Sequence, residues 1–305
     1  MRATGKTIEM STKATRLTVG FATTGRAEVL AQTVAHLGRQ TFLPDRILIS
    51  AISAKDHAGV ISDKIPLEFL TTARGLTQQR NHILDLCTPD EIVVFFDDDF
   101  VPCDDYLSNV VDVFSSHPDV AMVTGTVLAD GILNSGIAFH EAARIATSAS
   151  PAESDALTPV YNGYGCNMAI CNRAIQNQGL RFDEKLPLYS WLEDVDFSRL
   201  LASHGRIVCA AKIRGVHMGV KSGRTPGLRL GYSQIVNPFY LARKGTVTWS
   251  FGSRLAIRNI AANLIKSVKP EPYVDRIGRL RGNLRGLWHI VTRRADPARI
   301  IDFDF

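Results

Sequence analysis

The sequence has little cysteine and no long apolar run, and both absences narrow what the protein can be. Its 305 residues include five cysteines. Their odd number and the lack of a CxxC spacing argue against a disulfide framework or a cysteine metal site, and indicate reduced thiols. No stretch approaches the ~18 apolar residues of a membrane span. The opening MRATGKTIEMSTKATR is basic but lacks the apolar core of a secretory signal. These absences predict a cytoplasmic protein.

The overall composition shows no strong bias. Apolar residues make up 45% of the chain and charged residues 21%, ordinary values that exclude a disordered or collagen-like protein. The sequence shows no internal repeat and no low-complexity tract. A chain of this length can bury roughly 75% of its unfolded surface, which allows one large domain or two.

Charge, by contrast, is distributed unevenly along the chain. Residues 1–220 hold 19 Lys and Arg against 25 Asp and Glu, whereas residues 221–305 hold 16 against 5. This split favours an acidic catalytic body followed by a basic tail directed at an anionic surface. The alternative is an ordinary solvated surface with scattered arginines.

Apolar strands alternate with helical segments from residue 16 onward. We expect strands at 17–22, 46–52, 66–71, 92–96 and 120–125, and helices at 27–39, 76–87 and 104–116. This alternation predicts an α/β fold with a largely parallel sheet, whose ligands bind beyond the carboxyl ends of the strands. We expect a surface excursion over 141–160, then a core segment at 163–170, helices at 172–178 and 193–204, and strands at 206–210 and 213–217.

These elements predict three regions along the chain. Residues 1–15 form a flexible polar terminus and residues 16–220 a catalytic domain. Residues 221–305 then form a lid loop and a basic amphipathic helical extension, separated from the body by the Gly-rich MGVKSGRTPG over 218–227.

Three successive acids, Asp97, Asp98 and Asp99, follow the apolar run IVVFF. In extended chain Asp97 and Asp99 face one side and Asp98 the other. Two aligned carboxylates repel each other unless a cation lies between them, and oxygen ligands suit Mg²⁺ or Mn²⁺. Because Mg²⁺ completes its shell with water and substrate phosphates, the cluster indicates a metal that bridges protein and diphosphate. The alternative is a polar cap at the strand end.

The same run allows a second enzymatic hypothesis. An apolar strand followed by DxDx[TV], here residues 97–101, resembles the first motif of haloacid-dehalogenase-like phosphatases. Asp97 would then be a nucleophile and Asp99 an acid/base. That family usually carries the motif on its first strand, whereas three predicted strands precede it here.

A second group of acids lies at the start of the predicted helix over 193–204, at positions 193, 194 and 196. Ser190 and Glu193 have the spacing of a capping box, and acids suit the first turn of a helix. That interpretation leaves Asp194 and Asp196, beside the aromatic Trp191, without an explanation. A carboxylate at the mouth of a cleft suits a general base that acts on a sugar hydroxyl.

Five segments together resemble the family-two inverting glycosyltransferases of the GT-A fold. They are LTVGFATTGR, RGLTQQRN, FFDDDF with VPCDDYL after it, GYGCNMAICNR with GLRFDEKL, and WLEDVDFSRLLASHG. In that family these are a nucleotide-binding segment, a G-x-x-x-x-R-N helix start, the DxD motif, an acceptor-side segment and the ED motif. The resemblance covers about residues 16–217 and continues weakly to 245. It implies a Rossmann-like, mostly parallel sheet flanked by helices.

The resemblance also implies roles for individual residues. The nucleotide-sugar donor would contact Thr23, Arg26, Ser50, Arg80, Asp97, Asp98, Lys221 and Arg224. Asp99 and His217 would hold Mn²⁺ or Mg²⁺, Asp194 would be the catalytic base, and the acceptor would contact Asn167, Trp191 and Glu193. One position departs from the family, because many members end the second strand with an acidic pair where Ser50 and Ala51 stand here.

Two segments of the tail are amphipathic and basic. Residues 257–268 place five apolar side chains on one face, and residues 277–291 form an apolar stripe that includes Trp288. A basic amphipathic helix with tryptophan indicates contact with an anionic membrane surface. Gly278, Gly282 and Gly286 recur every fourth residue, which also allows close packing on the body. No nucleic-acid recognition motif accompanies the arginines, so we expect no nucleic-acid partner.

The resemblance implies a metal-dependent, inverting transfer of sugar from a nucleoside-diphosphate donor, with UDP-sugar the expectation by frequency. The acceptor would be a saccharide or a polyprenyl-linked glycan in the synthesis of surface or exported polysaccharide. We expect a cytoplasmic protein that is peripheral on the inner face of the cell membrane. A catalytically inactive membrane scaffold is the non-enzymatic alternative, and a homo-oligomer stays open.

Overall fold

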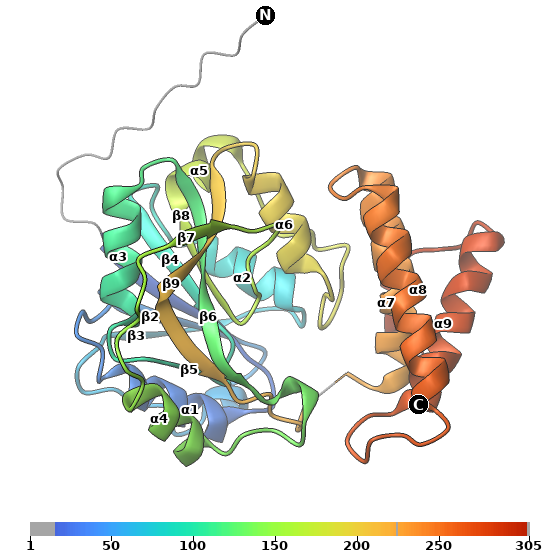
Figure 1. The fold of residues 1–305 in the computed structure, drawn as a ribbon, viewed down its shortest axis with the longest axis horizontal. Helices are drawn as coiled ribbons and strands as arrows, with labels where there is room; N and C mark the ends of the chain where they lie inside the picture. The colour runs from blue at the N-terminus through green and yellow to red at the C-terminus, as the bar shows by residue number, and fades with distance from the viewer. Residues whose placement is uncertain (1–15, 224, 304–305) are drawn as a thin grey trace, which may run out of the picture.

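The computed structural model describes residues 16–223 and 225–303. The predicted terminus over 1–15 and the predicted donor contact Arg224 lie outside the described residues. In the described part, the chain forms one nine-stranded sheet flanked by helices, with a group of three long helices toward its C-terminal end (Figure 1).

The elements follow one another as predicted over most of the chain. The strands are β1 (Arg16–Ala22), β2 (Arg46–Ala51), β3 (Leu67–Thr71), β4 (Glu91–Phe96), β5 (Phe100–Pro102), β6 (Val120–Asp130), β7 (Leu157–Pro159), β8 (Asn167–Cys171) and β9 (Arg206–His217). The helices are α1 (Ala27–Leu37), α2 (Leu76–Asp85), α3 (Tyr106–Ser116), α4 (Phe139–Thr147), α5 (Asn172–Gln178), α6 (Glu193–Leu201), α7 (Gly227–Lys244), α8 (Trp249–Lys266) and α9 (Arg276–Val291). Short 3₁₀ turns are η1 (Ala54–His57), η2 (Gly131–Leu133) and η3 (Pro297–Asp302).

The sheet is mixed, with a parallel half that places the acidic run. Its order is β3-β2-β1-β4-β8-β6-β9-β5, and β7 pairs with β9. Strands β1 to β4 are parallel, whereas β8 runs antiparallel between β4 and β6. All six residues of β4 are buried, as expected for a central strand covered on both faces. The acids at 97–99 therefore emerge at the carboxyl edge of the sheet.

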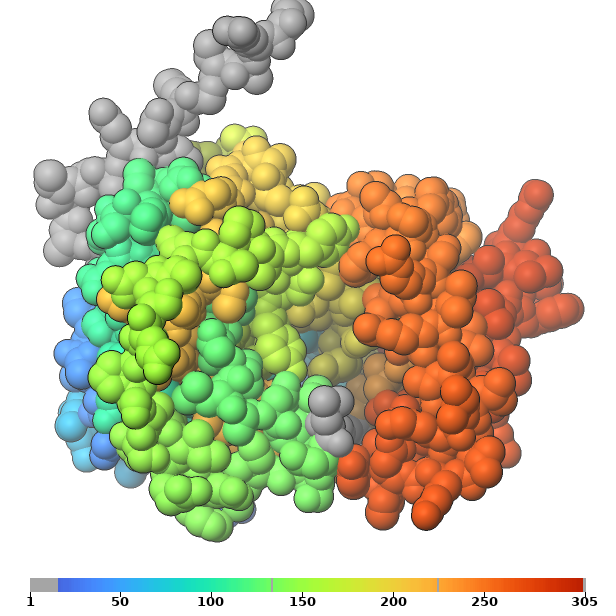
Figure 2. Space-filling view, viewed as in Figure 1, coloured from blue at the N-terminus to red at the C-terminus, as the bar shows by residue number. Residues whose placement is uncertain are grey.

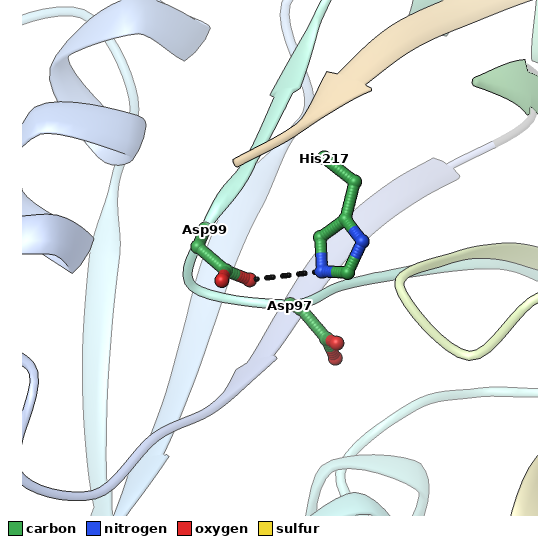
Figure 3. A group of neighbouring side chains, drawn as sticks. All are labelled: Asp97, Asp99 and His217. Carbon is green, nitrogen blue, oxygen red and sulfur yellow. Dashed lines mark ion pairs between the residues drawn. The ribbon is translucent and has the colours of Figure 1, made fainter. Parts of the chain in front are cut away.

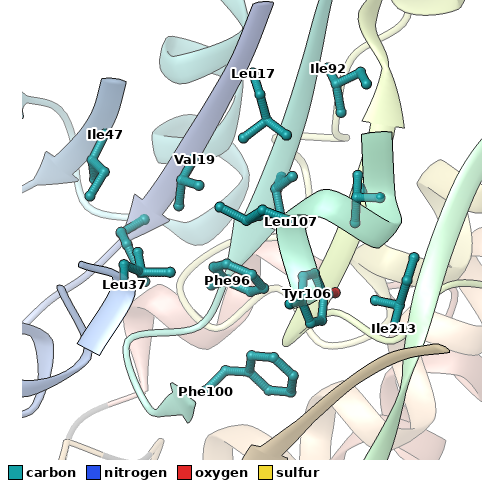
Figure 4. Close-up of a cluster of buried hydrophobic side chains, with 14 of the residues drawn as sticks. Leu17, Val19, Leu37, Ile47, Ile92, Phe96, Phe100, Tyr106, Leu107 and Ile213 are labelled. Carbon is teal, nitrogen blue, oxygen red and sulfur yellow. The ribbon is translucent and has the colours of Figure 1, made fainter. Parts of the chain in front are cut away.

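Two apolar layers cover the faces of the sheet. On one face, α1 and α3 pack against inward side chains of β1, β2 and β4, among them Leu17, Val19, Ile47 and Phe96 (Figure 4). On the other face, α2, α5 and α6 pack against the alternate strand residues, such as Val93 and Phe95. The strand period of two thus separates both cores.

Two predictions about the second half of the body are wrong in part. Residues 141–160 are not simply a surface excursion, because α4 buries Ala142 and Ala146 against the sheet and residues 157–159 pair with β9. The two short strands expected at 206–210 and 213–217 are one strand, β9. Its pairing with β6 shifts register between Gly125 and Thr126, which explains the interrupted pattern.

The three C-terminal helices pack on one another and on the catalytic body. Lys244, at the end of α7, lies 2.7 Å from Asp183 and 2.6 Å from Asp196 of α6. The Asn237 amide donates to the Trp191 carbonyl at 2.8 Å. A Cβ at Gly282 of α9 would overlap the Leu228 carbonyl of α7, so glycine there allows close approach of the two helices. Among the described helices, none is long and apolar enough to cross a membrane.

Candidate active site

Two carboxylates and an imidazole meet at the carboxyl edge of the sheet. Asp97 and Asp99 follow β4, and His217 ends β9, which the Phe100–His217 pairing brings alongside. Ligand atoms of the three side chains all lie within 4.8 Å of one another (Figure 3). Asp98 points elsewhere and accepts from Thr23 and Arg26, both at 2.9 Å. Asp98 therefore lies apart from the pair formed by Asp97 and Asp99, although the chain turns at 98–99 and is not extended as the prediction assumed.

Asp130, which the sequence analysis missed, orients the imidazole. His217 Nδ1 lies 2.9 Å from Asp130 Oδ1, and Tyr164 donates to the other oxygen at 3.0 Å. His217 Nε2 then lies 3.5 Å from Asp99 Oδ1. Burial alone would lower the pKa of His217, but its hydrogen bonds with Asp130 and Asp99 raise it to about 10. The register of β6 with β9, which pairs Asp130 with His217, was the missing signal.

This donor set fits a divalent metal ion. Two carboxylates and an imidazole are ligands that Mn²⁺ and Mg²⁺ accept, and metal-bound histidines usually bond a carboxylate through the other ring nitrogen. Burial and its acidic neighbours raise the pKa of Asp98 to about 7, although Arg26 opposes the shift. Burial would also raise the pKa of Asp99, but His217 and Arg26 lower it below its usual value. Burial likewise raises the pKa of Asp97. A bound cation would relieve this crowding of negative charge.

Arg80 lies beneath the acids and connects the two acidic motifs. Its guanidinium donates to Glu193 at 2.7 Å, to the Gly165 carbonyl at 2.8 Å and to Asp97 at 3.3 Å. It packs between aromatic rings and is only 2% exposed. The predicted contact between Arg80 and the nucleotide does not fit this burial. The side chain is an internal counter-ion for Asp97 and for Glu193, which lies 113 positions after it in the chain.

The ED motif begins α6, but not through the predicted capping box. Ser190 Oγ donates to the Leu186 carbonyl at 2.6 Å, and the N-cap residue is Leu192. The prediction is wrong because the Glu193 carboxylate is drawn to Arg80. Burial and the neighbouring Asp194 raise the pKa of Glu193 to about 8, although Arg80 lowers it.

Asp194 faces the acceptor-side segment. Its Oδ2 accepts from the Gly165 N–H at 3.1 Å, and its Oδ1 from the Val195 N–H at 2.8 Å. Burial raises its pKa despite these bonds. Three hydrogen bonds therefore connect Asp194 to Asp97, through Gly165 and Arg80.

The turn before α6 has a strained backbone. Leu188, Ser190 and Leu192 have φ of 58°, 53° and 77°, a left-handed conformation that costs L-residues roughly 1–2 kcal/mol each. Such strain concentrates at functional sites. Here it lies in the bend that leads into the ED motif at the start of α6.

A cleft of about 870 Å³, open solvent at its mouth included, lies beside the acids. Its walls contain the predicted donor residues Thr23, Arg26, Asp97 and Asp98. Sequence reasoning missed the other polar side chains that line it, which are Thr24, Arg74, Gln79, Tyr189, Thr225 and Arg229. Thr225 lies just before α7 and Arg229 in its first turn, so the cleft has walls from both the body and the C-terminal helices. Figure 2 shows a hollow between these parts of the molecule.

The segment over 218–223 closes one side of the site. The Val220 N–H donates to Asp99 at 2.8 Å, and Arg26 donates to the Ser222 carbonyl at 3.0 Å. Lys221 points toward the Gly131 and Ile132 carbonyls, at 2.8 and 3.1 Å. The predicted lid segment therefore contacts the acidic cluster directly.

Two other predicted contacts do not fit the structure. Ser50 is fully buried, and its hydroxyl lies 2.8 Å from that of Thr72. Asn167 is also fully buried; its side chain accepts from Thr124 at 2.6 Å and donates to the Gly125 carbonyl at 3.2 Å. Neither side chain reaches the surface, so both stabilise the sheet. Trp191 is half-buried and packs on an apolar cluster shared by α6 and α7.

A sheet with acids after β4, a facing histidine and a second acidic motif on α6 is the arrangement of a GT-A glycosyltransferase. The model of the family described as glycosyl transferase family 2 matches residues 18–183, and the chain belongs to this family. No curated protein matches the sequence. The family assignment leaves the phosphatase hypothesis without support.

Solved structures similar to this chain share the fold. The mannosyltransferase PcManGT from Pyrobaculum calidifontis, in complex with GDP-Man and Mn²⁺, has a TM-score of 0.57 at 16% identity, with 95% of this chain and 86% of that chain covered. S. aureus TarS 1-349 in complex with UDP-GlcNAc also has a TM-score of 0.57, at 14% identity, covering 93% and 82%. A longer TarS structure has a TM-score of 0.50 at 15% identity, and 73% of this chain spans only 40% of it.

Proposed function

We propose that the protein is a metal-dependent inverting glycosyltransferase that uses a nucleoside-diphosphate sugar. The observation that carries the proposal is the convergence of Asp97, Asp99 and His217 beside a cleft, with Asp194 linked to them through Arg80 and Gly165. Asp97, Asp99 and His217 would hold Mn²⁺ or Mg²⁺, which acts as a Lewis acid toward a diphosphate leaving group. Asp97 thereby joins the metal ligands as well as the donor site.

The donor would lie in the cleft beside Thr23, Arg26 and Asp98. Arg74, Tyr189 and Arg229, which also line the cleft, offer donors and an aromatic ring to a nucleotide. Similar structures hold UDP-GlcNAc or GDP-Man. We propose a UDP-sugar as the donor, and a GDP-sugar is the alternative donor to test in parallel.

Asp194 would be the general base. Its carboxylate takes the proton from an acceptor hydroxyl as that oxygen attacks the anomeric carbon, so the configuration inverts and no covalent enzyme intermediate forms. Burial raises the pKa of Asp194, which improves a carboxylate as a base near neutral pH. Glu193 accepts a hydrogen bond from Arg80 and so holds Arg80 in place. Trp191 precedes Glu193 by two residues, on the proposed acceptor side.

We propose a saccharide or polyprenyl-linked acceptor, in the synthesis of surface or exported polysaccharide at the inner face of the cell membrane. The catalytic domain would span residues 16–220, with the segment after Met218 as a lid. The intact acidic cluster and ED motif support an active enzyme over a degenerate scaffold, because a binding module needs neither.

The test is sugar transfer by the Asp194→Asn variant, which keeps the size of the side chain but removes the proton acceptor. Transfer should fall by roughly 10²–10⁴ while donor affinity barely changes. Glu193→Gln should be milder, since an amide oxygen still accepts from Arg80. Near-wild-type transfer by Asp194→Asn together with an inactive Glu193→Gln would assign the base to Glu193 instead.

A further inference from the structure

The C-terminal helices expose an unusual amount of apolar surface. Among the described residues, more than half of the exposed large apolar side chains lie between positions 249 and 301. On α9, Ile277 is 51% exposed, Leu284 59% and Trp288 62%. On α8, Ile257 is 65% and Leu264 57% exposed, and Val268 just past its end is 89% exposed. The first three form one stripe on α9 and the last three one stripe on α8, and we name the two stripes together the α8–α9 face.

Helix α9 turns its glycines inward and its large side chains outward. A Cβ at Gly282 would overlap the α7 backbone, and one at Gly286 would crowd Ile235 of α7. Ile277, Leu284 and Trp288 lie at i, i+7 and i+11, on the opposite side of the helix from these glycines. The packed-tail alternative therefore explains the glycines but not the apolar stripe.

Helix α8 likewise encloses a polar side chain and exposes apolar ones. Its fully enclosed side chain is Asn263, whose amide donates to Gln234 of α7 at 2.8 Å and to Asn283 of α9 at 2.9 Å. Ile257 and Leu264 lie at i and i+7 on a face away from Asn263. Soluble surfaces seldom leave such apolar patches uncovered. Helices α8 and α9 thus bury amides and glycines while they expose isoleucine, leucine and tryptophan.

Basic side chains flank the face and indicate what covers it. Exposed Arg254 and Arg258 adjoin Ile257 on α8, and exposed Arg281 lies between Ile277 and Leu284 on α9, at i+4 and i−3. Residues 221–305 carry 16 Lys and Arg against 5 Asp and Glu. A symmetric contact between two copies through this face would place these like charges together. An anionic lipid surface satisfies both the arginines and the apolar side chains.

We infer that the α8–α9 face docks the protein on an anionic lipid bilayer, with Leu284 and Trp288 entering the interface and the arginines meeting the headgroups. This inference rests on the proposed function and deepens it, because a polyprenyl-linked acceptor would lie at the surface of such a bilayer. The docked unit is tied to the catalytic helix: α9 packs on α7, and Lys244 of α7 is paired with Asp196 of α6. Docking would therefore set the orientation of the ED motif relative to the bilayer.

The test is co-sedimentation of the full chain with vesicles of phosphatidylglycerol and phosphatidylcholine in equal parts. Wild-type protein should bind these vesicles, bind more weakly as salt rises, and ignore vesicles of phosphatidylcholine alone. Leu284→Ser with Trp288→Ser should weaken binding at least ~10-fold. Arg254→Gln with Arg258→Gln should weaken it roughly fivefold per arginine. The control is Ile61→Ser, since Ile61 is 74% exposed on the catalytic body.

Three results with vesicles would each overturn the inference: no binding to anionic vesicles, equal binding to neutral ones, or unchanged binding by the Leu284/Trp288 variant. Self-association without vesicle binding, abolished by that variant, would assign the face to a second copy and also overturn it. Asp194→Asn should keep full vesicle binding. A failure of docking with intact transfer, or of transfer with intact docking, then identifies which proposal is wrong.

Discussion

Arg80→Met should be among the most damaging single changes outside the apolar core. The substitution removes the buried charge that Asp97, Glu193 and the Gly165 carbonyl share. Removal of one partner from a buried ion pair costs about 3–5 kcal/mol. The lower end applies here, because the pKa of Glu193 is already raised to about 8 and the side chain can take up a proton. We therefore expect the free energy of unfolding to fall by about 3 kcal/mol at pH 7.

The assay is urea unfolding followed by tryptophan fluorescence, with a double-mutant cycle. Glu193→Gln alone should cost about 1 kcal/mol, because the amide oxygen still accepts a hydrogen bond. The double variant should then lose at least ~1 kcal/mol less than the sum of the single losses. Arg181→Met is the matched control: Arg181 pairs with Asp85 at 2.6 Å, but both side chains are well exposed, so less than about 1 kcal/mol should be lost. Equal losses for both arginines, or additive effects in the cycle, would refute the buried link between the two acidic motifs.

Three further perturbations probe the rest of the account. The free energy of unfolding should fall as pH rises from about 4.5 to about 8, because the raised pKa of Glu193 lets the folded chain keep a proton that the unfolded chain releases. In plots of urea midpoint against pH, Glu193→Gln should lose part of this slope. An unchanged slope would contradict the raised pKa of Glu193. Gly282→Ala should lower the free energy of unfolding by about 1–3 kcal/mol through overpacking against α7, and thermal melts should show a smaller loss for the outward Leu284→Ala. Asp130→Asn should weaken Mn²⁺ binding by about 10-fold or more through loss of the histidine's orientation, whereas calorimetry should find no change for exposed Asp112→Asn.

Much of the fold could be predicted from local pattern. The apolar run over 92–96 of β4 and the alternating helices give the parallel half of the sheet, whereas the sides taken by the three acids depend on the turn at 98–99. The pattern could not show that β8 runs antiparallel inside the sheet, because a buried strand looks alike in either direction. Periodicity also identified the stripe on α9 but not its direction, since a helical pattern says which residues share a face and not which face is covered.

The site was harder to predict where long-range partners override local rules. Ser190 and Glu193 have the right spacing for a capping box, yet Glu193 is drawn to Arg80, more than a hundred residues earlier. The contact of Asp130 with His217 could not be predicted, because only the register of β6 with β9 brings the two residues together. Ser50 illustrates the opposite error: a position carried over from a resemblance says nothing about burial, and this hydroxyl is inside the sheet.

The most direct test of the central claim is calorimetric titration of UDP and GDP into the full chain, with Mn²⁺ and then with a chelator. The account predicts that one nucleoside diphosphate binds at least ~100-fold more tightly with the metal, a coupling of about 2.7 kcal/mol. Asp99→Asn should lose this difference, and exposed Asp112→Asn should keep it. Equal nucleotide affinity of the wild-type protein with Mn²⁺ and with chelator would contradict the claim that Asp97, Asp99 and His217 form a metal-dependent donor site.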